Sequence, residues 1–105
     1  MLKIKKILIE FKEKLIELYG AKLKEVILYG SYARGEETED SDIDLAIVLK
    51  GDIRPFEEID RMTNIAGDID LKYNILLSLH PISEKIYINR KTPLLVNIRE
   101  EGVLI

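Results

Sequence analysis

The sequence predicts an α/β (α+β) domain in which a small mixed sheet is flanked by helices. Two short apolar runs rich in branched residues, at 26–29 and 45–49, are typical of buried strands. Apolar residues also recur at three-to-four spacing over two longer segments, which indicates amphipathic helices. Strands that alternate with helices favour a layered architecture with helices packed on the sheet.

The first half of the chain is predicted to contain two helices and two strands. A helix over 3–19 can end at Gly20, and a strand over 25–29 follows it. Residues 31–35 open a short helix, and the second strand covers 43–49. The core-facing residues expected on the first helix are Ile4, Ile7, Leu8, Phe11, Leu15 and Leu18.

The second half of the chain is predicted to contain three helices and one strand. Pro55 suits the first turn of a helix over 55–73, and a strand over 75–82 comes next. The core stripe expected on this helix is Phe56, Ile59, Met62, Ala66, Ile69 and Tyr73. Ser83 can cap a short helix that follows this strand. Thr92, followed by Pro93, can cap a last helix that ends near Gly102.

Length and composition exclude several classes of protein. With 105 residues, we expect one domain over 1–105, with one core and no room for a second substrate-binding domain. No apolar run approaches the ~18 residues of a membrane span, and a chain without cysteine is expected to be cytoplasmic. The net charge of −3 disfavours general nucleic-acid binding, because such binding needs cations to neutralise phosphates.

A polar motif joins the two predicted strands and runs from Gly30 to Leu45. Gly30 and Ser31 form a turn that can approach a phosphate closely, because glycine has no side chain to intrude. At the other end, Asp42 and Asp44 lie two positions apart on a strand, so both carboxylates point to one face. Two carboxylates at the mouth of a sheet suit Mg²⁺ that is bound to substrate phosphates.

Each part of this motif also has a purely structural interpretation. A lone Asp-x-Asp is usually a solvated strand end, and a lone Gly-Ser is usually a turn or a helix cap. Arg34 could pair with a phosphate or with Glu36 or Glu37, and Ser41 can orient the start of the strand next to Asp42. The order of all these parts in one block favours a nucleotide site. The nucleotide-binding candidates are Gly30, Ser31, Arg34 and Ser41.

The block Gly-Ser-x-Ala-Arg-Gly, a spacer and Ser-Asp-x-Asp-Leu, at 30–45, resembles the signature of the DNA polymerase beta nucleotidyltransferase superfamily. The chain is similar to the minimal nucleotidyltransferases of this superfamily. Residues Thr92–Leu94 and Asn97–Gly102 also resemble the closing helix of that group. The resemblance implies the nucleotidyltransferase fold and in-line attack on the α-phosphate of ATP or another nucleoside triphosphate. It also implies Mg²⁺ or Mn²⁺ as the cofactor, with Asp42 and Asp44 as catalytic metal ligands.

The chain departs from this family at a third carboxylate, which relatives usually place on a neighbouring strand. The strand predicted at 75–82 carries Ser78 and His80 on one face and has no acid. Asp68 and Asp70 precede it and are expected to face solvent on the helix. In a rival register, Asp68 to Leu71 would form a strand that repeats the Asp-Ile-Asp-Leu pattern and supplies Asp70. The third position is therefore left open between Ser78 and Asp70.

The resemblance leaves several functions open. One is transfer of AMP or another nucleotide to a protein hydroxyl, as in minimal nucleotidyltransferases that are antitoxins of a HEPN-type ribonuclease partner. The alternative is a catalytically weak or inactive module that binds nucleotide or docks on its partner, as hetero- or homo-oligomer. Transfer to a small molecule is disfavoured because the chain has no room for an acceptor-binding domain.

Overall fold

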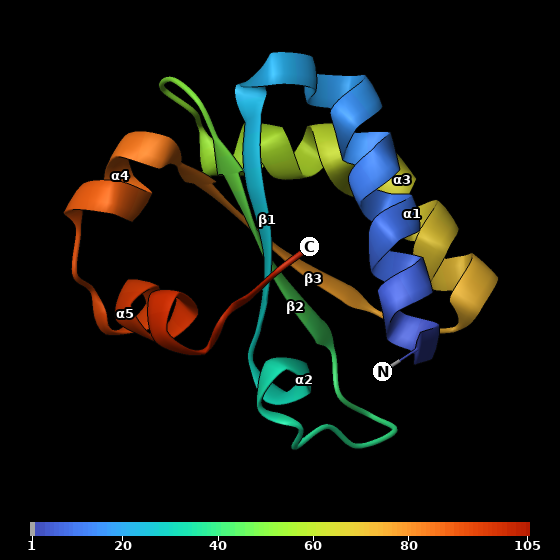
Figure 1. The fold of residues 1–105 in the computed structure, drawn as a ribbon. Helices are drawn as coiled ribbons and strands as arrows, with labels where there is room; N and C mark the ends of the chain where they lie inside the picture. Colours follow the sequence, from blue (N-terminus) through green and yellow to red (C-terminus); the bar gives the residue numbers. More distant parts are fainter. Residues whose placement is uncertain (1) are drawn as a thin grey trace.

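The computed structural model describes residues 2–105 and shows a four-stranded sheet between two helical layers (Figure 1). The predicted elements are present, and helix 55–73 and strand 43–49 have the predicted bounds. Within the described residues, no helix is long and apolar enough to cross a membrane. The elements are α1 (Leu2–Tyr19), η1 (Gly20–Lys22), β1 (Leu23–Tyr29), α2 (Ser31–Arg34), β2 (Ile43–Leu49), α3 (Pro55–Tyr73), β3 (Leu77–Ser83), α4 (Glu84–Asn89), α5 (Pro93–Glu101) and β4 (Val103–Leu104).

The sheet is mixed, as predicted, and its strands lie in the order β3-β2-β1-β4. β1 is antiparallel to β2 and to β4, while β2 and β3 are parallel. The two-residue strand β4 was not predicted, because its few apolar residues carry no periodic signal. It brings the end of the chain back beside β1 and thereby places the last turn of α5 next to the polar motif.

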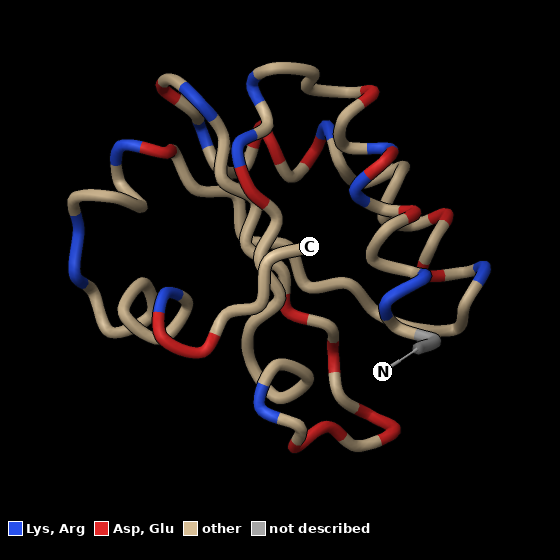
Figure 2. The backbone as a smooth tube through the Cα atoms, in the orientation of Figure 1, with Lys and Arg blue, Asp and Glu red and all other residues tan. Residues whose placement is uncertain are grey.

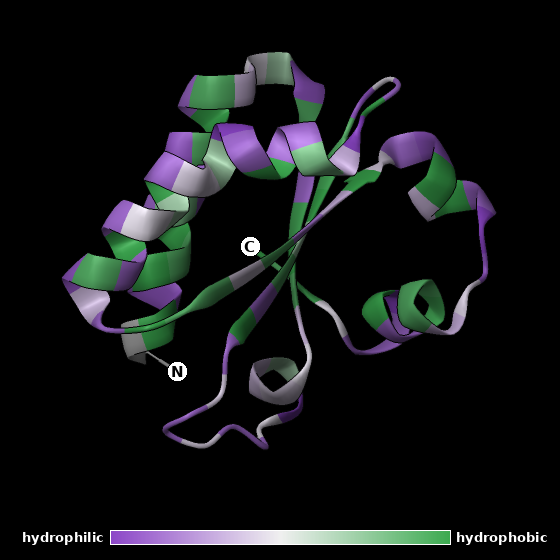
Figure 3. Ribbon diagram, turned by 180° about the vertical axis from the view of Figure 1, so that it is seen from behind, coloured by the Kyte–Doolittle hydropathy of each residue, from purple (hydrophilic) through white to green (hydrophobic). Residues whose placement is uncertain are grey.

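The two faces of the sheet are covered by different helices. α1 and α3 cover one face, and α4 and α5 cover the other (Figure 1). Alternate residues of β2 serve the two cores: Leu45 and Ile47 face α1 and α3, whereas Ala46 and Val48 face α5. Figure 3 shows the apolar strands between helices that alternate polar and apolar stretches. Asp44 shares the face of Ala46, which is the α4–α5 face.

Two residues of the predicted core stripes are exposed, and the predictions for them were wrong. Leu18 is 41% exposed because the adjacent Tyr19 takes the inward position at the end of α1. Phe56 is 85% exposed because Glu58 occupies the inward position in the first turns of α3. The Glu58 carboxylate is buried but partnered: it accepts hydrogen bonds from the Tyr19 hydroxyl at 2.8 Å and from Arg61 at 3.2 Å.

The predicted helix caps are present. The Ser83 hydroxyl accepts from the Ile86 amide at 3.2 Å, and the Thr92 hydroxyl accepts from the Leu95 amide at 3.3 Å. β3 begins at Leu77 rather than at residue 75, because Asn74 adopts a left-handed conformation (φ 54°) that ends α3. Asn74 and the Thr92 cap thus set where β3 and α5 begin, and both elements contribute residues to the candidate site.

Candidate active site

A row of polar side chains crosses three strands on the α4–α5 face of the sheet. Tyr29 of β1 pairs with Asp44 of β2, and Asp44 pairs in turn with Ser78 of β3. Residues in register on adjacent strands project to the same face. Asp42 lies one alternation before Asp44 and is exposed where the chain enters β2. Tyr29 is the last residue of β1, which leads into the Gly-Ser turn and α2 at one end of the sheet (Figure 1).

The glycine of the turn and the second aspartate are in direct contact. Gly30 has a φ of 76°, and a Cβ built on it would overlap the Asp44 Oδ2. The Asp44 carboxylate therefore lies directly over a backbone that has no side chain to keep other atoms away. The amides of Ala33 and Arg34 both donate to the Gly30 carbonyl at 3.1 Å, which fixes the turn. Phosphate-turn and metal-ligand candidates thus share one surface.

Replacing Gly30 with alanine should damage the site specifically. Gly35 offers a matched control, because its φ is 72° and a Cβ there meets nothing within 4 Å. Gly35→Ala should lose about 1–2 kcal/mol from left-handed strain, whereas Gly30→Ala should lose about 1–3 kcal/mol, because its ψ of −155° lies in a region that essentially only glycine adopts. Gly30→Ala should in addition displace Asp44 and weaken Mg-ATP binding by at least about tenfold, measured by calorimetry. Equal nucleotide affinities in the two variants would show that the contact has no role in binding.

The electrostatics of the pair suit a cation. Burial raises the pKa of Asp44, the Asp42 charge raises it further, and Arg34 and the Ser78 hydroxyl lower it. Acidic residues are also concentrated in the loop between α2 and β2, residues 36–42, called here the acidic loop (Figure 2). A divalent ion would relieve the repulsion at Asp44, and carboxylate oxygens are the ligands that Mg²⁺ prefers. The residues present therefore fit a magnesium ion that arrives with phosphates.

The other predicted nucleotide-binding residues have different surroundings. Ser31 begins α2 and is half-buried. The Ser41 hydroxyl accepts from the Thr38 amide at 2.9 Å, so it closes a turn in the acidic loop before β2. Arg34 pairs with Glu36 at 3.0 Å, one of the two acids considered for it, and with Glu101 of α5 at 3.1 Å.

Two residues near the site were not predicted from the sequence. Tyr29 stands beside Asp44, and its pKa is raised by burial and by the Asp44 charge. Glu101 accepts from Arg34 and also from the Gly30 amide, at 3.4 Å. Tyr29 could have been inferred from the pairing of two adjacent strands. Glu101 could not, because its approach depends on the unpredicted strand β4.

Of the two residues considered for the third position, Ser78 lies beside Asp44 in the sheet, and Asp70 lies in α3. Ser78 is the cross-strand neighbour of Asp44 and is close enough for its hydroxyl to lower the pKa of that carboxyl. The rival register is wrong, because residues 68–71 are helical within α3. Solvent exposure is confirmed for Asp68 but was wrong for Asp70, which is half-buried. Within residues 2–105, no three acidic, histidine or cysteine residues cluster so that they could hold a metal.

Asp70 has a structural role at the start of β3. Its Oδ1 accepts from the Leu77 amide at 3.0 Å and so anchors the strand that carries Ser78. Asp70→Ala should lower the free energy of unfolding by about 1–2 kcal/mol, because it leaves this amide without its partner. Asp70→Asn keeps an acceptor oxygen, so we expect a much smaller loss in urea unfolding. Asp68→Ala, two residues earlier and exposed, is the control; an equal loss there would contradict the anchoring role.

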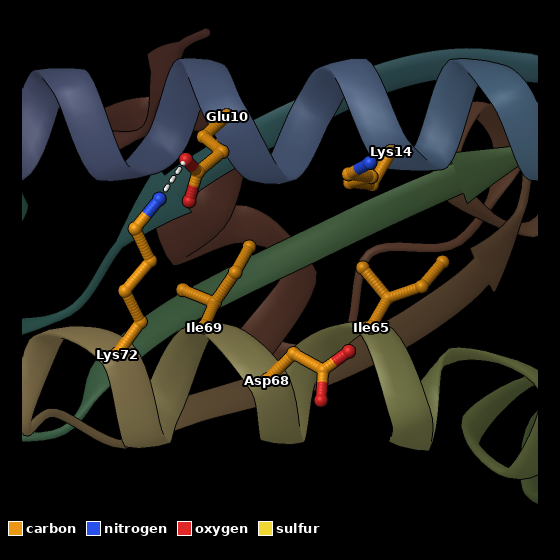
Figure 4. A pocket seen from close by; sticks show the side chains of 6 residues that line it. All are labelled: Glu10, Lys14, Ile65, Asp68, Ile69 and Lys72. Carbon is orange, nitrogen blue, oxygen red and sulfur yellow. Dashed lines mark hydrogen bonds and ion pairs between the residues drawn. The ribbon is translucent and has the colours of Figure 1, made fainter.

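A groove between α1 and α3 lies on the opposite face of the sheet from the site (Figure 4). Glu10 and Lys72 form an ion pair of 2.8 Å across it, and Asp68 lies on the α3 side. The charges that line this groove are therefore separated from Asp42 and Asp44 by the sheet and its core. The polar motif is located at the α2 end of the other face.

Comparison with known proteins agrees with this geometry. Residues 8–105 match the model of the nucleotidyltransferase domain family. Putative protein adenylyltransferase MJ0141 of Methanocaldococcus jannaschii is 38% identical over 102 residues, which cover 97% of this chain and 98% of that protein. The chain therefore belongs to the nucleotidyltransferase family and is a nucleotidyltransferase, as the motif predicted.

Solved structures show the same fold at lower identity. The crystal structure of a putative nucleotidyltransferase from Sulfolobus solfataricus aligns with a TM-score of 0.65 at 22% identity, over 98% of this chain and 79% of that chain. A structure of tri-AMPylated Shewanella oneidensis HEPN toxin in complex with MNT antitoxin aligns with a TM-score of 0.52 at 18% identity, over 90% of this chain and 67% of that chain. The predicted nucleotidyltransferase fold is confirmed.

Proposed function

We propose that this nucleotidyltransferase uses Mg²⁺ to transfer AMP from ATP to a hydroxyl side chain of a partner protein. The observation that carries the proposal is the Asp44 carboxylate, which lies with Asp42 on one face and directly over the bare backbone of Gly30. A metal ligand and a close phosphate approach are thereby combined at one point. Adenylyl transfer in particular is supported by MJ0141, a relative that covers nearly the whole chain and is named for it.

Each residue of the candidate site would have a separate role in the reaction. Asp42 and Asp44 would hold Mg²⁺, and Gly30 and Ser31 would place the triphosphate beside it. Bound Mg²⁺ would stabilise the charge that develops on pyrophosphate as it leaves, and would lower the pKa of the attacking hydroxyl. Ser78 can orient the Asp44 carboxylate through its hydroxyl but cannot serve as a base at neutral pH.

The acceptor is proposed to belong to a HEPN-type protein, so that the chain is the antitoxin of a toxin–antitoxin pair. Support comes from the shared fold with the complex in which a HEPN toxin is AMPylated beside its MNT antitoxin. Asp42 is exposed and Asp44 is partly exposed, so an acceptor side chain on another protein could reach the pair.

A second function is favoured by one observation, the serine that faces Asp44. A site with two carboxylates binds a metal nucleotide but activates the acceptor hydroxyl poorly, because relatives use a third carboxylate there. In that case the chain would neutralise its partner by docking, with slow transfer or none. The two functions differ in the transfer step, and docking can occur with or without a nucleotide bound at Asp42 and Asp44.

The test is transfer of label to the purified product of the neighbouring gene. The chain is incubated with Mg²⁺, this product and ATP labelled at either the α- or the γ-phosphate. Adenylyl transfer predicts α-label on the partner and γ-label in released pyrophosphate. GTP, CTP and UTP serve as unlabelled competitors that identify the base. A stable complex that carries no α-label would select the docking function.

A further inference from the structure

Glu101 occupies a position that suits a phosphate oxygen. Its Oε1 accepts from the Gly30 amide at 3.4 Å and from the Arg34 guanidinium at 3.1 Å. A backbone amide and a guanidinium that converge on one negatively charged oxygen form an anion-binding arrangement. The carboxylate of the last residue of α5 therefore takes the place of an anion at the turn.

This contact also neutralises Arg34, the basic residue of the motif. Arg34 pairs with Glu101 and Glu36, so its single positive charge faces two negative charges. The Gly30 amide and the Arg34 guanidinium, which a triphosphate at the turn would use as donors, are already bound to the Glu101 carboxylate. The arrangement thus opposes the binding of a phosphate that is not accompanied by a cation.

We propose that Glu101 is an internal gate, and that a phosphate group of the metal nucleotide binds the Gly30 amide and Arg34 only after displacing it. This inference rests on the proposed function, because the proposed function identifies the metal nucleotide as the anion that replaces Glu101. The displacement requires little energy, because the Glu101 side chain is 27% exposed and Arg34 is 43% exposed. Glu36 remains on Arg34 and holds the guanidinium at the turn.

Displacement occurs by rotation of the side chain, because the backbone at this point is fixed. A Cβ on Gly102 would overlap the Ile98 carbonyl oxygen and the Ile27 side chain. Val103 and Leu104 pair with β1, and the Ile105 amide donates to the Val26 carbonyl at 3.0 Å. The Glu101 side chain has several rotatable bonds and can turn to solvent while the chain on either side stays in place.

The test compares Glu101→Ala with Glu100→Ala, which removes the same charge from an exposed position one residue earlier on α5. Calorimetry with Mg-ATP, and with tripolyphosphate alone, should show binding about 3- to 10-fold tighter in Glu101→Ala and unchanged in Glu100→Ala. Glu101→Gln keeps the acceptor for the Gly30 amide and loses the charge, so it should be intermediate. In transfer assays Glu101→Ala should lower the KM for ATP and leave kcat unchanged.

Unchanged or weaker binding of both probes by Glu101→Ala, with its melting temperature retained, would overturn the gate and make Glu101 a support of the turn. Tighter tripolyphosphate binding by Glu101→Ala, in a protein that binds no Mg-ATP, would retain the gate and reject the proposed function. If neither variant nor the wild type binds either probe, the position is no anion site and the gate is rejected with the function.

Discussion

The double substitution Asp42→Asn with Asp44→Asn is expected to abolish Mg²⁺-dependent nucleotide binding and leave the fold intact. Asparagine preserves shape but removes the charge that a divalent cation requires. With each charged ligand worth about 1.5–3 kcal/mol, affinity for Mg-ATP should fall by at least about 100-fold. Transfer of AMP to the partner should be lost with it. Calorimetry with Mg-ATP, and with ATP in the presence of a chelator, measures the effect.

Stability separates this loss from unfolding. The raised pKa of Asp44 means that the native state binds this proton more tightly than the unfolded chain does. The associated stability is present at low pH and is lost as the pH rises through that raised pKa. Asparagine does not titrate, so the double variant should be at least as stable as the wild type at neutral pH without metal.

The control for charge alone is Glu39→Gln with Asp40→Asn, which removes two exposed charges from the acidic loop and leaves the pair in place. It should retain most of the Mg-ATP affinity. Undiminished Mg-ATP binding in the Asp42/Asp44 variant would contradict the assignment of these two aspartates as metal ligands. An equal loss in the control would mean that the loop attracts the metal nucleotide by its total charge.

The substitution Ser78→Asp should raise AMP transfer to the partner, by about tenfold or more if the missing carboxylate limits the reaction. Ser78 is the cross-strand neighbour of Asp44, so an aspartate there joins the pair on the same face. The new carboxylate can bind the metal and accept the proton of the attacking hydroxyl. Without a divalent cation, the third charge should lower the melting temperature, and Mg-ATP should restore it.

Two variants isolate the position from the charge. Asn64→Asp adds the same charge on an exposed part of α3 and should change neither transfer nor melting. Asp70→Asn should leave transfer unchanged, because Asp70 binds the Leu77 amide and lies outside the metal site. Transfer that collapses in Asp70→Asn, or that falls in Ser78→Asp, would show that the third position has been assigned incorrectly.

The parts of the fold that were predicted correctly depend on local signals. A short apolar run rich in branched residues defined β2, three-to-four spacing defined α3, and Ser83 and Thr92 marked the helix starts. The errors occurred where tertiary contacts overrode the pattern. Glu58 is buried in place of Phe56 because Tyr19 and Arg61 partner its carboxylate, and neither partner can be identified from periodicity.

The residues of the candidate site also include some that local sequence signals predict and others that depend on tertiary contacts. Gly30, Ser31, Asp42 and Asp44 lie in one short block, and strand alternation was enough to predict that the two aspartates share a face. The pairing of β1 with β2 then places Asp44 beside Gly30. Glu101 reaches the turn from a segment far along the chain, and its approach requires β4 to pair with β1. The position of Asp70 depends on how α3 ends and β3 begins, which the left-handed Asn74 determines.

The central claim, that Asp42 and Asp44 direct adenylyl transfer to a protein hydroxyl, is tested most directly by intact-mass spectrometry of the partner. The product of the neighbouring gene is incubated with ATP, Mg²⁺ and either the wild-type chain or the Asp42→Asn, Asp44→Asn variant. We predict that the wild type adds one or more AMP groups, which peptide mapping places on hydroxyl side chains, and that the variant adds none. An unmodified partner with the wild-type chain, or equal modification with the variant, would contradict the claim.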